Sequence, residues 1–257
     1  MRTVFNFSNE NLASFSKIYD FKGSRVLSVG GSGDQYFTAI LNGAKEVTLF
    51  DNDPLFFHFF VAKFCAIQNM SYSEFYDLFI TQDAFFSDIF EVIESYLPEE
   101  RKDEVAESRY SIRPEYGWND RQRLVKARTI PYLNPIGYQK LQHKLIGRDL
   151  PKVYFENITN LQKVLGNSPY DIMLTSNIFG WLPTGFTEKN FFELLQSFNC
   201  KTFQATYAYQ LPFQRDSTFG RQCKETRVKG WLWDDHQTDY VYTYKKTKKG
   251  TTYGKSI

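Results

Sequence analysis

Cysteine and histidine are scarce in this chain, which holds three of each in 257 residues. Cys65, Cys200 and Cys223 show no C-x-x-C spacing, and an odd number of cysteines cannot close into a complete set of internal disulfides. We therefore expect reduced thiols and a cytoplasmic location. The three histidines are equally dispersed, so no cluster has the ligand spacing of a zinc site and we expect no bound metal.

Long apolar runs and an excess of one charge are also missing. The N-terminus has no charged segment followed by an apolar stretch, so a signal peptide is not expected. The aromatic-rich stretch 54–67 is interrupted by His58 and Lys63 and is too short to cross a bilayer. Lysine and arginine total 31 against 29 acidic residues, a net charge of +2, which gives no strong indication of nucleic-acid binding.

Aromatic residues, by contrast, are abundant. The chain holds 25 Phe, 17 Tyr and 4 Trp, and each of these side chains can bury a large apolar area. Disorder over the whole chain is therefore excluded. A chain of this length can form one large core, and we expect a single domain over residues 1–257.

The clearest local pattern is a strand that leads through a glycine turn into a helix. The apolar run 26–29 meets Gly30-Gly31-Ser32-Gly33, and residues 35–41 then have helical spacing. A second strand, 46–50, ends at Asp51, and Pro54 suits the first turn of another helix. The alternation predicts an α/β fold, Rossmann-like, with a mostly parallel sheet.

The alternation is interrupted between residues 69 and 151 by a charged, helix-like stretch. This stretch is much longer than a crossover requires, so we interpret it as a helical insertion that could serve as a substrate lid. Further strands are expected at 152–155, 171–175 and 201–207, and the segments 225–233 and 238–245 predict an antiparallel pair that closes the sheet. The basic tail, 246–257, is expected to be solvated and mobile.

The glycine turn and Asp51 define the predicted ligand site. A glycine turn at a helix N-terminus presents backbone N–H groups to a ligand, and an acid at the next strand tip can accept both hydroxyls of a ribose. The dinucleotide fingerprint would need a third glycine where Tyr36 stands, which disfavours a dinucleotide. The pattern favours S-adenosylmethionine, with Asp34 facing the ammonium of its tail. The alternative is a tight structural connection, with Asp51 capping the next helix.

Residues 26–79 resemble a family of S-adenosylmethionine-dependent enzymes. The matching features are Ser32-Gly33-Asp34, Asp51-x-Asp53-Pro54, Lys63, Ile67 and Ser71-Tyr72-x-x-Phe75-x-x-Leu78-Phe79. The family is that of the 3-amino-3-carboxypropyl transferases, which make the diacylglyceryl-homoserine precursor of betaine lipids. The resemblance implies a methyltransferase-type fold, with the glycines and Asp34 at the methionine moiety, Asp51 at the ribose and Asn157 near the adenine. The full cofactor-binding set that we expect is Gly30, Gly31, Ser32, Gly33, Asp34, Asp51, Asn52, Asn157 and Asn177.

The acceptor side is less well defined. Asn177 stands where amino-directed nucleic-acid methyltransferases carry Asn/Asp-Pro-Pro-aromatic, and the missing prolines make base methylation a lesser interpretation. Trp181 could offer an aromatic face to a cation. In the insertion, Arg113, Tyr116 and Tyr138 could hold a carboxylate, a phosphate or a flat group of the acceptor, although a salt-bridged, exposed helix pair is the alternative. No residue is indicated as the catalytic base.

The sequence therefore predicts an S-adenosylmethionine-dependent transferase that moves the 3-amino-3-carboxypropyl group to a small-molecule or lipid acceptor. Methyl transfer is the alternative reaction. An interaction module that binds the nucleoside without turning it over is the alternative from another class. The nucleoside product would distinguish the three hypotheses. Methylthioadenosine would identify aminocarboxypropyl transfer, S-adenosylhomocysteine would identify methyl transfer, and the absence of both would identify the interaction module.

Overall fold

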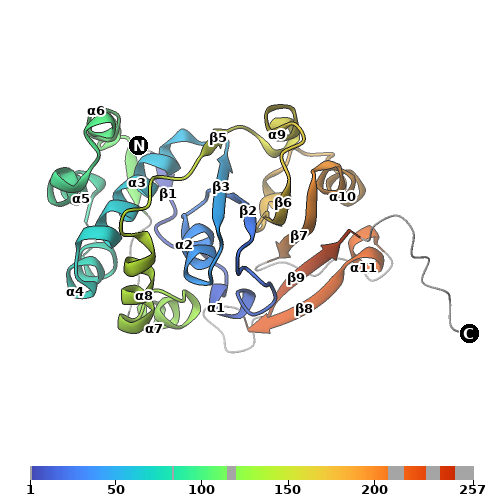
Figure 1. Ribbon diagram of the computed structural model, residues 1–257, viewed down its shortest axis with the longest axis horizontal. Helices are drawn as coiled ribbons and strands as arrows, with labels where there is room; N and C mark the ends of the chain where they lie inside the picture. Colours follow the sequence, from blue (N-terminus) through green and yellow to red (C-terminus); the bar gives the residue numbers. More distant parts are fainter. Residues whose placement is uncertain (1, 83, 115–119, 208–216, 230–237, 247–257) are drawn as a thin grey trace, which may run out of the picture.

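The computed structural model describes residues 2–82, 84–114, 120–207, 217–229 and 238–246. Its centre is a seven-stranded sheet (Figure 1). In their spatial order the strands are β5 (Val153–Phe155), β3 (Glu46–Asp51), β2 (Arg25–Val29), β6 (Tyr170–Leu174), β7 (Cys200–Tyr207), β9 (Thr238–Lys245) and β8 (Lys224–Lys229). The first five are parallel, whereas β9 runs antiparallel to both β7 and β8.

This strand order identifies the fold. The chain moves outward from β2 to β3 and β5, returns to the other side of β2 at β6, and ends in an antiparallel hairpin. That is the topology of the Rossmann-like S-adenosylmethionine-dependent methyltransferase fold, so the expected fold class is confirmed. The order reverses between β2 and β6, and ligands of open parallel sheets bind outside the carboxyl ends of the strands at such a point.

Helices cover both faces of the sheet because neighbouring strand residues point to opposite sides. Val26 belongs to the core shared with α2 (Asp34–Leu41) and α3 (Pro54–Asn69). Leu27 belongs to the core on the other face, which is covered by α9 (Ile158–Leu165), α10 (Glu188–Ser197) and α11 (Thr218–Gln222). The short helix α1 (Leu12–Phe15) packs on Val241 of β9.

Helix α3 is buried around most of its circumference. Pro54 occupies its first turn, and Asp53 caps it by accepting the backbone N–H of Leu55. A helix that is apolar on every side must be enclosed by other elements. The enclosing elements come from the insertion.

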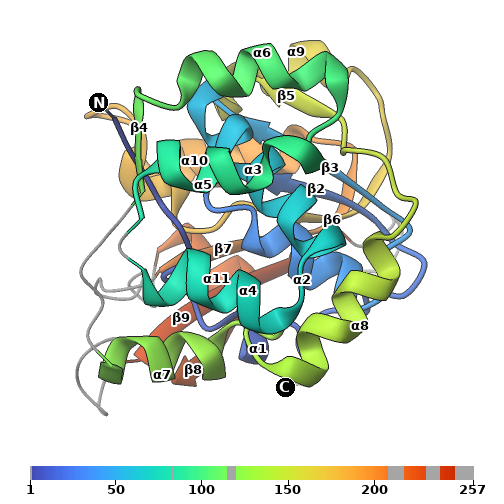
Figure 2. The ribbon, with the colours of Figure 1, turned by 90° about the vertical axis from the view of Figure 1, so that its left-hand side faces the viewer.

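The insertion wraps around α3 and completes its core. Its elements are α4 (Tyr72–Tyr76), a π-helical turn (Asp77–Thr81), α5 (Phe86–Ile93), a 3-10 turn (Glu94–Tyr96), α6 (Glu99–Ser108), β4 (Ile112–Pro114), α7 (Asp120–Thr129) and α8 (Pro135–Leu145). Figure 2 shows α4, α5, α6 and α8 stacked over α3. Strand β4 pairs in parallel with β1 (Arg2–Val4), so the insertion also holds the N-terminal segment.

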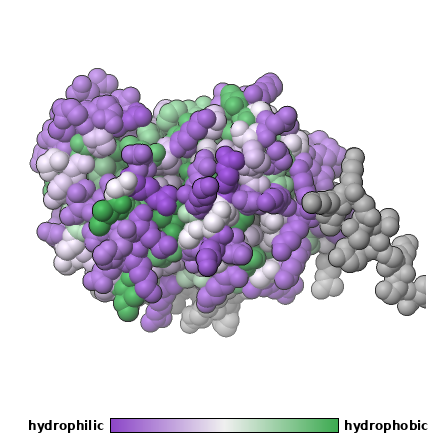
Figure 3. Space-filling model, viewed as in Figure 1, coloured by the Kyte–Doolittle hydropathy of each residue, from purple (hydrophilic) through white to green (hydrophobic). Residues whose placement is uncertain are grey.

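The viewed surface is largely hydrophilic, with small, separated apolar areas (Figure 3). Within the described ranges, no helix combines the length and the apolar character that crossing a membrane requires. Lys246 continues the pairing of β9 with β7, because its backbone N–H donates to the carbonyl oxygen of Lys201. The remainder of the predicted mobile tail, from residue 247, lies outside the described residues.

Candidate functional site

The glycine turn and Asp51 meet at the carboxyl edge of the sheet. The backbone N–H of Gly31 donates to Asp51 Oδ2 over 2.9 Å, and the N–H of Asp53 donates to Asp51 Oδ1 over 3.0 Å. Each carboxylate oxygen has a second lone pair with which it can accept a further donor. The tips of β2 and β3 therefore share one polar site, as the sequence predicts.

The Asp51 side chain is half-buried. Burial raises its pKa, whereas the backbone N–H groups of Gly31 and Asp53 lower it. These hydrogen bonds favour the charged form, because an N–H donates more strongly to a carboxylate than to a neutral acid. The charged form is also the form that accepts hydroxyl groups at both oxygens.

Two different structural reasons explain why glycine stands at three positions of the turn. A Cβ at Gly30 would collide with the ring of Phe56, and a Cβ at Gly33, where φ is +79°, would lie 2.5 Å from the ring of Phe60. Gly31 has φ of +50° and no atom within 4 Å of the place where a Cβ would stand. Helix α3 therefore explains the glycines at 30 and 33, and only Gly31 has an open side.

Asp34 is enclosed and already has its partners. Its side chain is 0% exposed, and the ammonium of Lys63 lies 3.0 Å from Oδ1. Tyr132 donates its hydroxyl to the same oxygen, while Ser32 and the backbone N–H of Ser8 donate to Oδ2. This arrangement corrects the expectation that Asp34 faces the ammonium of a bound cofactor, because the Lys63 ammonium and three further donors already occupy its carboxylate.

The Lys63 ammonium also ties the N-terminal segment to the glycine turn. It donates to the carbonyl oxygens of Asn6 and Ser32, the latter over 2.8 Å. Burial lowers the pKa of Lys63, and the Asp34 carboxylate opposes this effect. From α7, Lys126 donates to the carbonyl oxygen of Ser8. Two buried lysines thus fix residues 6–8 beside the turn, and the apolar surroundings of Lys63 in the sequence were the only signal of this role.

A third carboxylate, that of Glu10, lies at the point where the strand order reverses. Ser176, directly after β6, donates to Glu10 Oε1 over 2.7 Å, and Gln35 of α2 donates to Oε2 over 2.7 Å. Ser176 has φ of +52° and is the one non-glycine residue with positive φ among those described. Nothing in the sequence around Glu10 indicated that it would reach this position.

The remaining predicted cofactor residues stand at strand tips or caps. Asn157 follows β5 and caps α9, where its Oδ1 accepts the backbone N–H of Thr159 over 3.0 Å. Asn52 is exposed directly after Asp51. Asn177 is half-buried after β6, and Ser32 is buried with its hydroxyl on Asp34. The strands that carry these residues are neighbours, so their carboxyl ends share one edge.

The predicted acceptor residues are not gathered in one place. Tyr138 is fully buried and donates its hydroxyl to the carbonyl oxygen of Met70 over 3.1 Å, so it is a core residue and the acceptor prediction for it is wrong. Arg113 is exposed on β4, and Trp181, which is 72% exposed, lies in the 3-10 turn after β6. Tyr116 lies outside the described residues.

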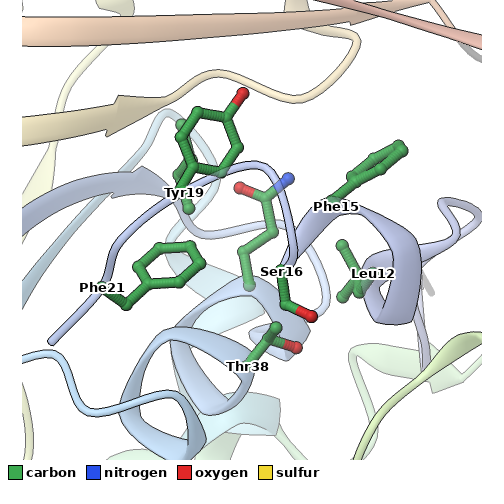
Figure 4. A pocket seen from close by; sticks show the side chains of 8 residues that line it. Leu12, Phe15, Ser16, Tyr19, Phe21 and Thr38 are labelled. Atoms are coloured by element: carbon green, nitrogen blue, oxygen red, sulfur yellow. The ribbon is translucent and has the colours of Figure 1, made fainter. Parts of the chain in front are cut away.

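A small cavity lies between α1 and α2, close to the glycine turn but too small for a nucleoside. Its volume is about 10 Å³, which is room for one water molecule. Figure 4 shows the apolar side chains of Leu12, Phe15 and Phe21 around it, with the Thr38 hydroxyl at its wall. No partner for the Thr38 hydroxyl is found in the described structure, and a single water would satisfy it.

Comparisons with known proteins reveal likeness only at the level of structure. No family model matches the chain, and no curated protein matches it. The chain is similar to the solved rRNA methyltransferase AviRa of Streptomyces viridochromogenes, with 14% identity, a TM-score of 0.43 and coverage of 91% of this chain and 82% of that one. It is also similar to a TehB-like S-adenosylmethionine-dependent methyltransferase of Corynebacterium glutamicum, with 9% identity, a TM-score of 0.34 and coverage of 92% of this chain and 87% of that one. A third similar structure is the 16S rRNA methylase ArmA, with 11% identity, a TM-score of 0.35 and coverage of 91% of this chain and 83% of that one.

The fold of the present chain is identified by the strand order of its sheet. Within the described ranges, no group of three or more His, Cys, Asp or Glu side chains could hold a metal ion. The site consists instead of backbone N–H groups, an open glycine and carboxylates.

Proposed function

We propose that this protein is an S-adenosylmethionine-dependent transferase, with the nucleoside bound at the carboxyl ends of β2 and β3. The observation that carries the proposal is the 2.9 Å hydrogen bond from the Gly31 N–H to Asp51 Oδ2, which brings the open glycine and the strand-tip acid together. The position of this contact beside the reversal of strand order supports the same conclusion, because that is where open parallel sheets bind ligands.

The residues present fit the cofactor. The Asp51 carboxylate accepts backbone N–H groups and, with two lone pairs on each oxygen, still has capacity to accept ribose hydroxyls. The open side of Gly31 allows a ligand to approach the backbone. When bound, the sulfonium of S-adenosylmethionine makes its three attached carbons electrophilic. The task of the chain is then to align one of these carbons with the nucleophile, since the enzyme selects the reaction by geometry.

For the transferred group we propose methyl, which is the reaction for which this fold is named. The 3-amino-3-carboxypropyl group is the second candidate, because residues 26–79 resemble transferases of that group. The acceptor we propose is a small molecule or a lipid.

The nucleoside product decides between these reactions. The protein is incubated with S-adenosylmethionine and a panel of amines and lipids, and the nucleosides are separated by chromatography. S-adenosylhomocysteine supports methyl transfer, and methylthioadenosine supports 3-amino-3-carboxypropyl transfer. Tight binding without either product would replace the proposal by the binding module, and absence of binding would overturn both.

Substitution of Asp51 tests the site itself. Asp51→Asn should weaken S-adenosylmethionine binding by about 10- to 100-fold, since each charge-assisted hydrogen bond contributes on the order of 1.5–3 kcal/mol. Calorimetry measures the affinity. Asp171→Asn is the matched control, because Asp171 lies at the opposite, amino end of β6, where it pairs with exposed Lys201. Equal affinities in the two variants would remove Asp51 from the site.

A pair of glycine variants separates ligand contact from packing. Gly31→Ala should lower the free energy of unfolding by about 1–2 kcal/mol, the cost of left-handed backbone, and should weaken nucleoside binding. Gly33→Ala should be more destabilising because its methyl group also meets Phe60. Binding that survives Gly31→Ala unchanged would show that the open side of this glycine does not face the ligand.

A further inference from the structure

A second buried acid lies at the same edge of the sheet as Glu10. Asp239 is at the start of β9, and the pairing of Tyr207 with Tyr240 places it beside the carboxyl end of β7. It alternates in phase with Val241, which packs on α1, so it points to the face that carries the N-terminal segment. Its side chain is 0% exposed.

Asp239 lacks the partners that buried carboxylates normally have. Neither of its carboxylate oxygens has a donor at normal hydrogen-bond geometry in the described structure, and the Asn11 backbone N–H is the one group there that stabilises its charged form. Its closest electrostatic neighbours are the Glu10 carboxylate, which raises its pKa, and the backbone N–H of Asn11, which lowers it. With burial as the largest cause, the pKa of Asp239 rises to about 7.

Glu10 contrasts with Asp239 in its hydrogen bonds. Both of its oxygens accept donors, from Ser176 and Gln35, which come from the two elements that flank the point of reversal. The donor Ser176 has a left-handed backbone, a conformation that residues with a Cβ seldom adopt. A hydrogen-bonded acid, an acid with few donors and a residue with left-handed backbone therefore occur together beside the predicted ligand site.

A purely structural role does not account for this arrangement. A buried carboxyl without donors lowers stability, and a second carboxylate nearby lowers it further. Unfavourable groups of this kind are typical of sites whose ligand supplies what is missing. A cation would supply it, because both acids would then face an opposite charge.

We propose that Glu10 and Asp239 form the anionic wall of the acceptor site, and that they bind an amine acceptor as its ammonium and take its proton. This inference rests on the proposed function and names its substrate class. The acceptor nitrogen first gives a proton to Asp239. Its lone pair then forms the new C–N bond as the C–S bond breaks, and the electron pair of that bond stays on sulfur. Asp239 finally releases the proton to solvent.

The pH range of this step follows from the surroundings of Asp239. Among the described residues, the groups that act on its pKa are the Glu10 carboxylate and the Asn11 backbone N–H. Between pH 6 and pH 8 Asp239, whose pKa is about 7, gains most of one negative charge. Binding of a cation beside it should therefore tighten over this range, whereas binding of a neutral ligand should not.

Two nucleosides test the inference without knowledge of the natural acceptor. Sinefungin carries a protonated amine where S-adenosylmethionine carries its methyl group, and S-adenosylhomocysteine carries nothing there. In the wild-type protein, the affinity for sinefungin relative to S-adenosylhomocysteine should rise from pH 6 to pH 8. Asp239→Asn should abolish this rise and weaken sinefungin binding about tenfold at pH 8, as expected for a lost charge-assisted hydrogen bond. Its S-adenosylhomocysteine affinity should change less than about twofold.

Two further variants make the result decisive. Glu10→Gln should also lower the ratio of the sinefungin affinity to the S-adenosylhomocysteine affinity. Asp51→Asn should weaken the binding of both nucleosides equally and leave this ratio unchanged. A ratio that is unchanged in both Asp239→Asn and Glu10→Gln would overturn the inference while leaving the proposed function intact. A wild-type protein that binds neither nucleoside would overturn the proposed function, and the inference with it.

Discussion

Asp34 and Asp239 are two carboxylates with the same burial and opposite surroundings. Both side chains are 0% exposed. Asp34 accepts hydrogen bonds from Lys63, Tyr132, Ser32 and the Ser8 backbone, and one of these donors is a cation. Asp239 has no donor at normal hydrogen-bond geometry in the described structure and has the Glu10 carboxylate as an electrostatic neighbour.

The difference shows that burial alone does not indicate whether an acid is structural or functional. The partners of Asp34 compensate for its desolvation and join the glycine turn, α3 and the N-terminal segment in one network. In the described structure only the Asn11 backbone N–H offsets the desolvation of Asp239, so we expect this acid to lower the stability of the fold. A group that lowers stability is best explained by a role in binding or chemistry.

The largest expected effect comes from breaking the Asp34 network. Lys63→Met keeps most of the side-chain volume but leaves the Asp34 carboxylate buried without its cation. The free energy of unfolding should fall by about 3–5 kcal/mol. Urea unfolding followed by circular dichroism measures it.

An exposed ion pair provides the control for Lys63→Met. Lys201 lies 2.6 Å from Asp171, and 79% of its side chain is exposed. Lys201→Ala should therefore lower stability by less than about 1 kcal/mol. Equal losses in the two variants would contradict the structural role of the Asp34 network.

A smaller loss is expected from the tyrosine that completes this network. Tyr132 is buried beside Asp34, which together with burial raises its pKa, so its hydroxyl remains a donor to the carboxylate. Tyr132→Phe removes this charge-assisted bond and should lower the free energy of unfolding by about 1.5–3 kcal/mol. Thermal and urea unfolding would detect it, and a variant as stable as the wild type would show that Asp34 does not depend on the hydroxyl.

For Asp239 the sign of the stability change reverses. An unfolded aspartate has a pKa near 3.9, and the folded value is about 7, so between these values the folded state binds more protons. This acid therefore lowers the stability of the wild-type protein progressively as pH rises from 4 to 7. Asp239→Asn should be the more stable protein at pH 8, by about 1–2 kcal/mol, and should approach the wild type near pH 4.

Unfolding in urea at pH 4, 6 and 8 measures this difference. Asp34→Asn is the contrasting variant, because it weakens a network in which every partner is already in place and should be less stable than the wild type at pH 8. A loss of stability at pH 8 in Asp239→Asn would show that Asp239 is held by favourable partners and would remove the contrast between the two acids.

The smallest effect is expected at Tyr138, which the sequence placed at the acceptor. Tyr138→Phe loses a neutral hydrogen bond to the Met70 carbonyl oxygen and should lower stability by about 0.5–1.5 kcal/mol. Nucleoside affinity and turnover should be unchanged, as measured by calorimetry and product analysis. A specific loss of turnover would return Tyr138 to the acceptor site.

Local patterns predicted the part of the fold that depends on neighbouring residues. The strand, glycine turn and helix around residues 26–41, and the position of Asp51 at the next strand tip, follow from the sequence because each element is short and continuous. The contact between Gly31 and Asp51 then follows from placing two parallel strands side by side. The same reasoning could not explain the glycines at 30 and 33, since their reason is the packing of Phe56 and Phe60 from a later helix.

Contacts between distant residues account for what sequence reasoning missed. Tyr132 reaches Asp34 across 98 positions, and Ser176 reaches Glu10 across 166. An arginine- and tyrosine-rich insertion has the same composition whether it forms a lid or a wall around α3, so Tyr138 was assigned to the acceptor.

The sequence by itself determined the class of fold and the glycine turn and strand-tip acid of the proposed site, because hydrophobic periodicity and glycine conformation act over a few residues. Only the tertiary structure decided which acids are neutralised and which are left unpaired. That outcome depends on the groups that long-range packing brings within hydrogen-bond distance, and the electrostatic cost of a buried charge is set by those neighbours.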